Sequence, residues 1–503
     1  MDAVAAGIAL LADPFSILLI FVGVVVGVVV GALPGLSSPM AVALLLPFTI
    51  GLDPLPAIAM LAALYCAGTF GGSITAILIN APGAPPAVAT AFDGYPMAKR
   101  GEAGRALGLA AISSVIGGVF SLFVFLLATP LLAQFALKFR PPEYFALAVF
   151  ALSMLATISG KSPVRNLIAG ALGVLISTVG IHLTSGVERF TFGMPDLAEG
   201  IHFVPVLIGL FAMSELLNQS QSLNVVYERI TSVVVRLPSF KELMGMKGTI
   251  MRSSAIGTFI GILPAEGSTV AAIIGYNEAI RWADDKEKEE FGKGSPLGIV
   301  GPEAANNAAT GGAMVPTLAL GIPGSATTAL ILAALIMHGF RPGPYLLRET
   351  PEFVYAIFGA MLIANFMFLG IGLAGARLFA RITLIPTRFL WPVVFVFSMI
   401  GAYAYSTSIF DVWVMLCAGI LGFVMARHGF GAAPLVMGLI LGAPIEESLA
   451  QSLIMFDNSW LMFLDSPIVC VFFALTALNL VWPTVSAFVK RARRLQGAPG
   501  PEA

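Results

Sequence analysis

The chain has 503 residues, of which 58% are hydrophobic and only 11% are charged. Soluble domains carry roughly a quarter charged residues, so this composition excludes a soluble globular protein. The formal net charge of −1 gives no support for nucleic-acid binding. Several apolar runs reach the roughly 20 residues that a helix needs to cross a bilayer. We therefore expect an all-α polytopic membrane protein that crosses the lipid bilayer about ten to twelve times and also contains re-entrant or broken helices.

In chain order, the apolar segments fall into two halves, 1–217 and 248–488. The first half holds segments near 14–33, 38–50, 56–79, 104–130, 143–159, 165–184 and 201–217. The second half holds segments near 248–263, 268–280, 299–320, 325–339, 352–380, 384–404, 411–427, 431–444 and 459–488. The connector 218–247 mixes apolar and charged residues, which is typical either of an amphipathic surface helix or of a plain loop. Residues 489–503 form a basic tail.

Two interrupted segments recur at matched places in the two halves. Residues 69–83 of the stretch 65–96 correspond to residues 310–324 of the stretch 301–344 at a constant separation of 241 residues, and residues 31–38 of the stretch 31–49 correspond to residues 261–268 of the stretch 261–280 at a separation of 230. The matching residues are Thr69 and Thr310, Gly71 and Gly312, Pro82 and Pro323, Gly83 and Gly324, then Gly31 and Gly261, Pro34 and Pro264, and Ser38 and Ser268. Gly and Pro break helices, and paired breaks in two halves indicate the binding site of a transporter.

The distribution of Lys and Arg predicts the orientation of the chain in the membrane. The loop from Lys99 to Arg105 and the C-terminal tail are both basic, so both are expected in the cytoplasm. Counting crossings back from the tail places the loop 341–352 outside. The loops that follow the two equivalent breaks would then face opposite sides, which is the arrangement of an inverted-topology repeat.

Hydroxyl and amide side chains cluster at these breaks. A helix that starts just after Pro82 and Gly83, or after Pro323 and Gly324, would direct free N–H groups and its positive dipole end at the break, which suits a carboxylate. Each polar residue taken alone could instead satisfy a neighbouring helix, but their clustering favours a binding role for the set. The predicted substrate-binding residues are Ser37, Ser38, Thr69, Ser73, Asn80, Pro82, Gly83, Asn306, Asn307, Thr310, Pro323, Gly324, Ser325 and Thr327.

Acidic residues and freed carbonyl groups beside the breaks are candidate cation ligands. Glu303 and Glu266 could bind a cation or carry a proton, although Glu303 could instead cap the first turn of its own helix. Freed carbonyl groups before each break suit Na⁺. A Na⁺ site is expected near Gly35, Asn80, Glu303 and Gly321.

Other acidic residues are expected to have structural roles. Asp93 is expected to be a turn or cap residue. Glu446, Glu447, Asp457 and Asp465 fall in a predicted outer loop, where they would be solvated or would contact an extracytoplasmic partner.

The sequence contains no P-loop and no recognisable catalytic constellation, so we expect neither an enzyme nor a cofactor. Its three cysteines have neither metal-ligand nor redox spacing. Two alternatives stay open: an intramembrane enzyme that uses buried carboxylates, and a channel-like subunit.

Three stretches resemble the large membrane subunit of the bacterial tripartite tricarboxylate transporters. They read GTFGGSITAILINAPGAPPAVATAFDGYPMAKRGEAGRALG (68–108), GPEAANNAATGGAMVPTLALGIPGSATTALILAALIMHGFRPGP (301–344) and GALPGLSSPMAVALLLPFT (31–49). The resemblance extends over nearly the whole chain. One departure is Leu-Pro-Ala-Glu at 263–266, where the family usually has Leu-Pro-Gly.

The resemblance implies a function and partners. It implies the permease subunit of a secondary importer of tricarboxylates or related carboxylates, driven by a cation gradient in which Na⁺ is the coupling ion. A small membrane subunit and a periplasmic substrate-binding protein would be its partners. The expected location is the bacterial inner membrane, with the C-terminus in the cytoplasm. Movement would be elevator-like.

Overall fold

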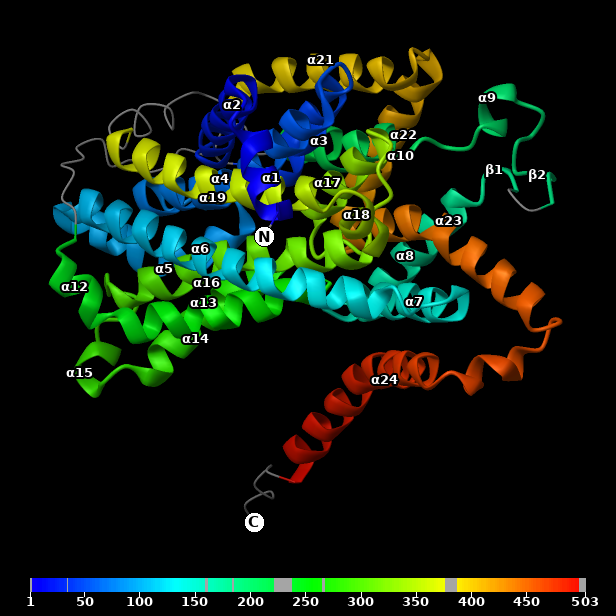
Figure 1. Cartoon of the computed structure of the whole chain (residues 1–503). Coiled ribbons are helices and arrows are strands. Elements are labelled where there is room, and N and C mark those ends of the chain that lie inside the picture. Colours follow the sequence, from blue (N-terminus) through cyan, green and yellow to red (C-terminus); the bar gives the residue numbers. More distant parts are fainter. Residues whose placement is uncertain are drawn as a thin grey trace. The chain divides into compact units, whose positions relative to one another are not determined.

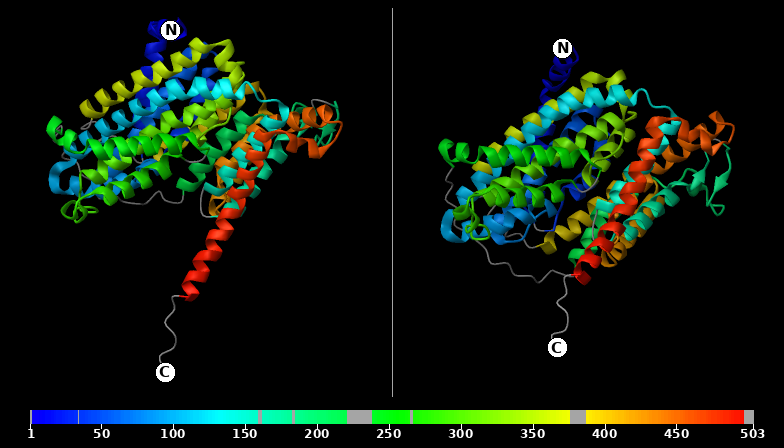
Figure 2. Two further views of the ribbon diagram at one scale, coloured as in Figure 1. Left: turned by 60° about the horizontal axis from the view of Figure 1, so that its bottom comes forward. Right: turned by 90° about the horizontal axis from the view of Figure 1, so that it is seen from below.

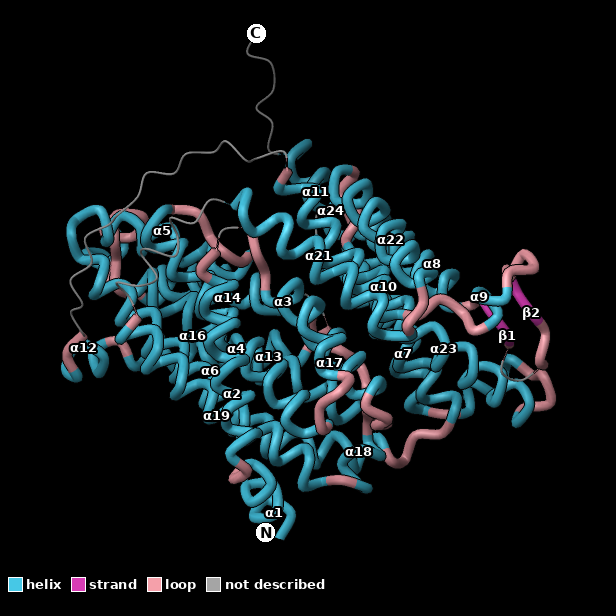
Figure 3. The backbone as a smooth tube through the Cα atoms, turned by 90° about the horizontal axis from the view of Figure 1, so that it is seen from above, coloured by secondary structure: helices cyan, strands magenta, loops and turns pink. Residues whose placement is uncertain are grey.

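The computed structural model describes residues 2–33, 35–158, 162–182, 185–220, 238–264, 267–375 and 387–496. In this part of the chain nearly all regular structure is helical, and the only sheet is the antiparallel pair β1 (Gly180–Ile181) and β2 (Glu188–Arg189) (Figure 3). Six of the described helices are long and apolar enough to cross a membrane, and six shorter helices are also apolar. The expected all-α polytopic membrane fold is confirmed.

Packing divides the chain into two compact units, which are described separately. Unit 1 consists of Met1–Leu137 and His202–Val424, and unit 2 consists of Lys138–Ile201 and Met425–Ala503. Each unit therefore combines an early and a late part of the chain. This is a different division from the two sequence halves, 1–217 and 248–488, which remain a prediction from the repeat.

Unit 1 contains most of the helices, and Figure 1 labels the majority of them. Its helices are α1 (Asp2–Leu11), α2 (Pro14–Gly31), α3 (Ser38–Leu45), η1 (Leu46–Thr49), α4 (Pro54–Ile79), η2 (Pro85–Ala87), α5 (Val88–Met97), η3 (Ala98–Glu102), α6 (Ala103–Ala136), α10 (Phe203–Ile208), η4 (Gly209–Met213), α11 (Ser214–Gln219), α12 (Phe240–Gly245), α13 (Lys247–Ile262), α14 (Gly267–Trp282), α15 (Asp285–Lys288), α16 (Leu297–Leu320), α17 (Ala326–Met337), α18 (Pro344–Glu349), α19 (Pro351–Ala374), α21 (Thr387–Ser406) and α22 (Ile409–Arg427), the last of which runs past the boundary of the unit.

The core of unit 1 is built around α4 and α16. Both helices are buried almost from end to end. Helix α4 packs against α2 and α19, and α16 packs against α6, α13 and α14, so segments from the early and the late parts of the sequence interleave (Figure 2). Burial on every side is typical of helices at the core of a large protein.

The sequence repeat corresponds to a repeated packing contact. A Cβ atom added to Gly31 of α2 would lie 2.8 Å from the Cα of Gly71 in α4, and one added to Gly261 of α13 would lie 2.9 Å from the Cα of Ala309 in α16. Gly312, the counterpart of Gly71, also approaches Gly261 closely. Small residues let helix backbones approach one another in membrane proteins. The same close helix crossing therefore occurs once in each half.

The two central helices end in the same way. Helix α4 ends at Asn80 (φ 52°, ψ 30°) and α16 ends at Gly321 (φ 71°, ψ 20°), both in the left-handed conformation. The next N–H donates to a carbonyl six residues back, from Ala81 to Thr75 at 3.4 Å and from Ile322 to Pro316 at 3.3 Å. The same two carbonyls also accept the N–H of the cap residue itself, and this left-handed cap satisfies carbonyl groups that the helix end would otherwise leave unpaired.

Unit 2 contains α7 (Pro141–Ile158), α8 (Pro163–Ser177), β1, β2, α9 (Pro195–Ala198), α23 (Ala432–Met455), η5 (Trp460–Asp465) and α24 (Pro467–Gln496). Helix α23 packs against both α7 and α8, and α24 packs against α7. Phe463 of η5 is buried between aromatic rings, with Phe145 and Phe456 centroids at 5.8 Å and 5.4 Å.

Three sequence-based boundaries differ from the structure. The predicted segment 165–184 ends earlier, because α8 stops at Ser177 and the hairpin follows. The predicted segment 431–444 is too short, because α23 continues to Met455 and includes Glu446 and Glu447. The predicted tail begins inside α24, which runs to Gln496. Most of the connector, residues 221–237, lies outside the described residues.

The left-handed caps give a testable difference between two substitutions. Asn80→Gly should leave stability nearly unchanged, because both residues tolerate a positive φ. Asn80→Ala should lower the free energy of unfolding by about 1 kcal/mol, because a Cβ atom with no polar group is disfavoured there. Thermal unfolding of the purified chain in detergent measures the effect. Equal stability of the two variants would contradict the role assigned to this cap.

Candidate functional site

A cavity of about 190 Å³ lies in unit 1 where several helices begin. It is lined by Ser37, Ser38, Pro39, Tyr65, Thr69, Ala84, Pro85, Pro86, Phe211, Ser268, Thr269, Ser325, Ala326 and Thr327. Most of these residues belong to four helix starts, those of α3, η2 with α5, α14 and α17. Tyr65 and Thr69 come from the side of α4, and Phe211 comes from η4.

The four helix starts form two matched pairs. Ser38 at the start of α3 and Ser268 at the start of α14 are 230 residues apart, and Ala84 and Ser325 are 241 residues apart. Each half of the sequence therefore contributes two helix starts to one cavity. The repeats meet at this cavity.

The breaks hold these helix starts in place. The N–H of Gly83 donates to the carbonyl of Gly72 at 3.2 Å, and the N–H of Gly324 donates to Oγ1 of Thr317 at 3.3 Å. A Cβ atom on Gly83 would collide with the carbonyl oxygen of Gly31, and one on Gly324 would lie 2.7 Å from the Cα of Ala313. Only glycine allows each break to approach the central helix this closely.

The chemistry of the cavity is that of a weak anion site. Helix starts present N–H groups and a positive partial charge, and the lining adds hydroxyl groups but no Lys or Arg. Ser325 caps α17, since its Oγ accepts the N–H of Thr328 at 3.2 Å. The hydroxyl of Tyr65 lies 3.2 Å from Oγ of Ser325, which links α4 of the first half to α17 of the second.

A second set of polar residues, the Glu303 cluster, is buried around Glu303 of α16. It consists of Glu303, Ser73, Thr90 and Ser114, and all four side chains are fully buried. Oε1 of Glu303 accepts hydrogen bonds from Ser73 of α4 and Thr90 of α5, and Oε2 accepts one from Ser114 of α6 at 2.8 Å. The carboxylate therefore joins three other helices and does not cap the first turn of α16, so the capping alternative is wrong.

The structure separates the predicted substrate residues into three groups. Ser37, Ser38, Thr69, Ser325 and Thr327 line the cavity. The turns at the breaks contain Asn80, Pro82, Gly83, Pro323 and Gly324, which do not appear in the lining. Buried positions on α4 and α16 hold Ser73, Asn306, Asn307 and Thr310. Asn307 donates to Oδ1 of Asn306 at 2.9 Å, and Thr310 donates to the carbonyl of Asn307 at 2.7 Å.

Sequence reasoning missed several residues of these sites. Tyr65 and Phe211 line the cavity, but their sequence context is that of ordinary core aromatics. Ser114 lies in the middle of a long apolar helix, where no sequence signal distinguishes it. Thr90 follows the first break by only a few residues, and this position could have indicated it.

The expected Na⁺ positions differ in their surroundings. The carbonyl of Gly35 already accepts a hydrogen bond from Gln219. Asn80 and Gly321 form the left-handed caps of α4 and α16. Of the four positions, only Glu303 supplies a negative charge. Glu266 lies outside the described residues.

Asp93 is a residue inside helix α5 and not the turn or cap residue that its sequence context predicts. It is fully buried in α5. It accepts the N–H groups of Gly294 and Ser295 at 2.9 Å and 2.8 Å, just before α16, and the hydroxyl of Tyr276 at 2.9 Å. Asp93 thus fixes the start of α16 to α5 and α14.

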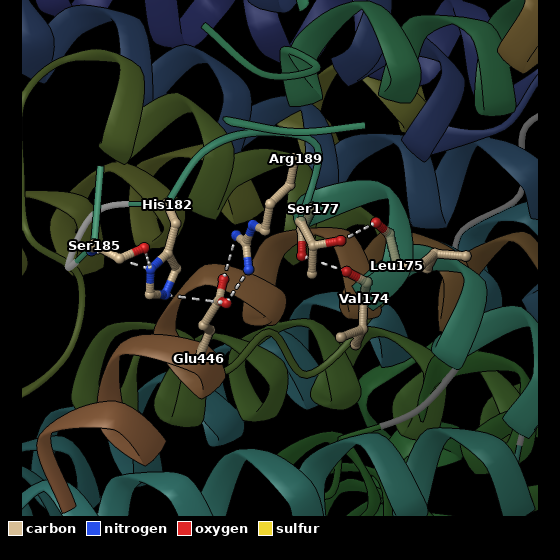
Figure 4. A network of polar contacts seen from close by, with 8 residues as sticks. Val174, Leu175, Ser177, His182, Ser185, Arg189 and Glu446 are labelled. Atoms are coloured by element: carbon tan, nitrogen blue, oxygen red, sulfur yellow. Dashed lines mark hydrogen bonds and ion pairs between the residues drawn. The ribbon is translucent and has the colours of Figure 1, made fainter. Parts of the chain in front are cut away.

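Unit 2 contains a separate ion-pair network, shown in Figure 4. Arg189 of β2 donates to both carboxylate oxygens of Glu446 in α23, with Nη2 2.9 Å from Oε2. Nε2 of His182 lies 3.3 Å from Oε1 of the same carboxylate. The hydrogen bond to Glu446 raises the pKa of the Arg189 guanidinium above its ordinary value. Glu446 is therefore a helix residue that anchors the hairpin, and its predicted place in an outer loop is wrong.

Comparison with known proteins gives one family and two relatives. The model of the family described as "Tripartite tricarboxylate transporter TctA family" matches residues 17–437. An "Uncharacterized 52.8 kDa protein in TAR-I ttuC' 3'region" of Agrobacterium vitis is 37% identical over 458 residues, 90% of each chain. An "Uncharacterized protein in TAR-II ttuC' 3'region" of the same organism is 35% identical over 225 residues, 45% of this chain and 91% of that protein. No solved structure matches.

The ion-pair network predicts how the hairpin responds to substitution. Arg189→Ala should accelerate amide hydrogen exchange at Gly180, Ile181 and Glu188, because it removes the bidentate hydrogen bond between the hairpin and α23. Glu446→Ala should have the same effect, and the double variant should add little to either. Hydrogen–deuterium exchange with mass spectrometry makes the measurement. Unchanged exchange in both single variants would show that other contacts hold the hairpin.

Proposed function

Since the chain belongs to the tripartite tricarboxylate transporter TctA family, and is thus a subunit of a tricarboxylate transporter, we propose that it is the permease subunit of a cation-coupled importer of tricarboxylates or related carboxylates. The observation that carries the proposal is the cavity in unit 1. It brings four helix starts together, two from each half of the chain.

The electrostatics of the cavity support a carboxylate substrate. Each helix start carries roughly half a positive charge, spread over N–H groups that have no partner inside the helix. Several such starts directed at one cavity attract an anion, as in other sites built from helix N-termini. Because no Lys or Arg lines the cavity, the attraction is moderate. A carrier benefits from this, because it must also release its substrate.

The charge of the substrate supports coupling to a cation. A tricarboxylate carries more negative charge than uncharged N–H groups and hydroxyls can balance in a buried site. A co-transported cation supplies the missing positive charge, and we propose Na⁺ for this role. The sequence contains no nucleotide-binding motif that would indicate ATP as the energy source.

The repeat supports alternating access. Transporters with inverted repeats bind substrate near the midplane between the repeats and expose it to each side in turn. Here the two halves make the same close helix crossing and meet at the cavity. We propose that the halves are inverted repeats in a bacterial inner membrane, with the C-terminus in the cytoplasm. A small membrane subunit and a periplasmic binding protein that delivers the substrate complete the proposed system.

Uptake into proteoliposomes tests the function. The vesicles contain this chain, its small partner subunit and the binding protein, and they receive labelled citrate or other carboxylates with and without an inward Na⁺ gradient. We expect saturable accumulation that needs both the gradient and the binding protein. Flux that does not saturate would indicate a channel-like subunit. Conversion of the substrate in detergent would indicate an enzyme.

Two glycine substitutions test the site. Gly83→Val and Gly324→Val should abolish uptake, because each side chain would push a break away from its central helix and displace the adjoining cavity wall. Gly51→Val is the matched control, since an added Cβ atom there has nothing within 4 Å. Uptake and the amount of protein in the membrane are measured together. Normal uptake by Gly83→Val or by Gly324→Val would show that this cavity is not the substrate-binding site.

A further inference from the structure

The Glu303 cluster has an unusual balance of charge for a buried carboxylate. Among the described residues, buried Asp411 has His202 as a partner at 3.1 Å, and buried Asp93 accepts two N–H groups at the start of α16. Glu303 lies inside α16, and the groups that face its carboxylate are three hydroxyls and the neutral side-chain amide of Asn306. Neutral hydroxyls compensate a buried charge poorly, and an unpaired buried charge is strongly destabilising.

The donor set of the cluster fits one small, hard cation. It offers two carboxylate oxygens and three hydroxyl oxygens, and oxygen donors suit hard cations. Asn307 follows Glu303 by four residues, so it lies beside it on the same face of α16. Oδ1 of Asn307 is buried and has no hydrogen-bond partner among the described residues. This amide oxygen is a further ligand that a cation would satisfy.

The repeat shows that the fold does not require an acid at this position. The residue 241 positions before Glu303 is Ala62 of α4, which is also fully buried. By contrast, Thr310 is matched by Thr69. The second half therefore has a carboxylate where the equivalent helix of the first half has only a methyl group. Burying a carboxylate is energetically costly, so its presence in only one of the two repeats indicates a functional role and not a packing role.

The cluster is also connected to a wall of the cavity. Ser73 lies at the end of α4 and Thr90 at the start of α5, on either side of the first break. Between them lie Ala84, Pro85 and Pro86, which line the cavity. The carbonyl of Gly72, next to Ser73, accepts the N–H of Gly83 in the break. Any ligand that draws the two hydroxyls together fixes α5 against α4 and thereby fixes this wall.

We propose that the Glu303 cluster, with Oδ1 of Asn307, binds the coupling Na⁺, and that the bound ion orders the cavity wall formed by Ala84, Pro85 and Pro86. One carboxylate balances one positive charge, so the site takes a single monovalent cation. Because the ion and the substrate both favour the ordered wall, each strengthens binding of the other by the same factor. This inference rests on the proposed function and names the place where its cation acts.

Equilibrium binding of radioactive Na⁺ to the purified full chain tests the site without transport. Glu303→Gln keeps the shape and removes the charge, and it should abolish measurable binding. Ser114→Ala removes one ligand and should weaken binding about tenfold, as losses at metal sites commonly do. Thr90→Val should also weaken binding, and Thr90→Ser should restore it because it keeps the hydroxyl.

Ser113→Ala is the matched control. Ser113 is as fully buried as its neighbour Ser114 and lies in the same helix, but its hydroxyl donates to backbone carbonyls of α6. The Ser113→Ala variant should bind Na⁺ with the same affinity as the unaltered chain. A second readout is the rise in unfolding temperature with added NaCl relative to KCl, since a ligand that binds only the folded state stabilises it. That rise should disappear in Glu303→Gln.

The outcomes separate this inference from the proposed function. Unchanged Na⁺ binding in Glu303→Gln, or equal weakening in Ser113→Ala and Ser114→Ala, would overturn the site while leaving carboxylate uptake untouched. Stabilisation by acid pH in place of Na⁺ would overturn the choice of ion. Na⁺ binding that depends on Glu303, in a chain that accumulates no carboxylate, would support the site and reject the importer.

Discussion

Within a membrane protein, every backbone N–H and carbonyl that a helix break frees must find a partner inside the protein. The centre of unit 1 depends on meeting this constraint twice. At Asn80 and Gly321 the chain leaves a fully buried helix, and the left-handed cap returns the next N–H to a carbonyl six residues back. The glycine three residues later then lies directly against the central helix. Because these polar groups are paired locally, the N–H groups of the following helix starts can serve a ligand.

The parts of this arrangement that depend on local chemistry could be predicted from the sequence. Gly-Pro breaks, matched spacings and clustered hydroxyls indicated where the helices stop and which helix starts matter. Ser37, Ser38 and Ser325 were predicted for this reason, and they line the cavity. The helical membrane class followed from the low share of charged residues together with apolar runs of roughly 20 residues.

The rest depends on contacts between distant parts of the chain. Ser114 meets Glu303 across 189 residues of sequence, and Glu446 meets Arg189 across 257. A serine in an apolar helix or a glutamate near a helix end looks the same in a sequence whether or not such a partner exists. The division into two units was equally hidden, because each unit joins segments from both ends of the chain. Sequence periodicity shows which residues share a helix face, but it does not show which helix covers that face.

The cavity walls are joined unequally. Asp93 and Tyr276 tie α5 to α14, and the rings of Phe92 and Tyr276 also meet with centroids 5.3 Å apart. On the other side, α3 packs against α17. The four helix starts thus form two pairs, each built from one early and one late segment. The pair of α3 and α17 also packs against α4, and the contact between Tyr65 and Ser325 lies at that junction. Separating either pair into its own helices would mean breaking a buried carboxylate network or a packed helix pair.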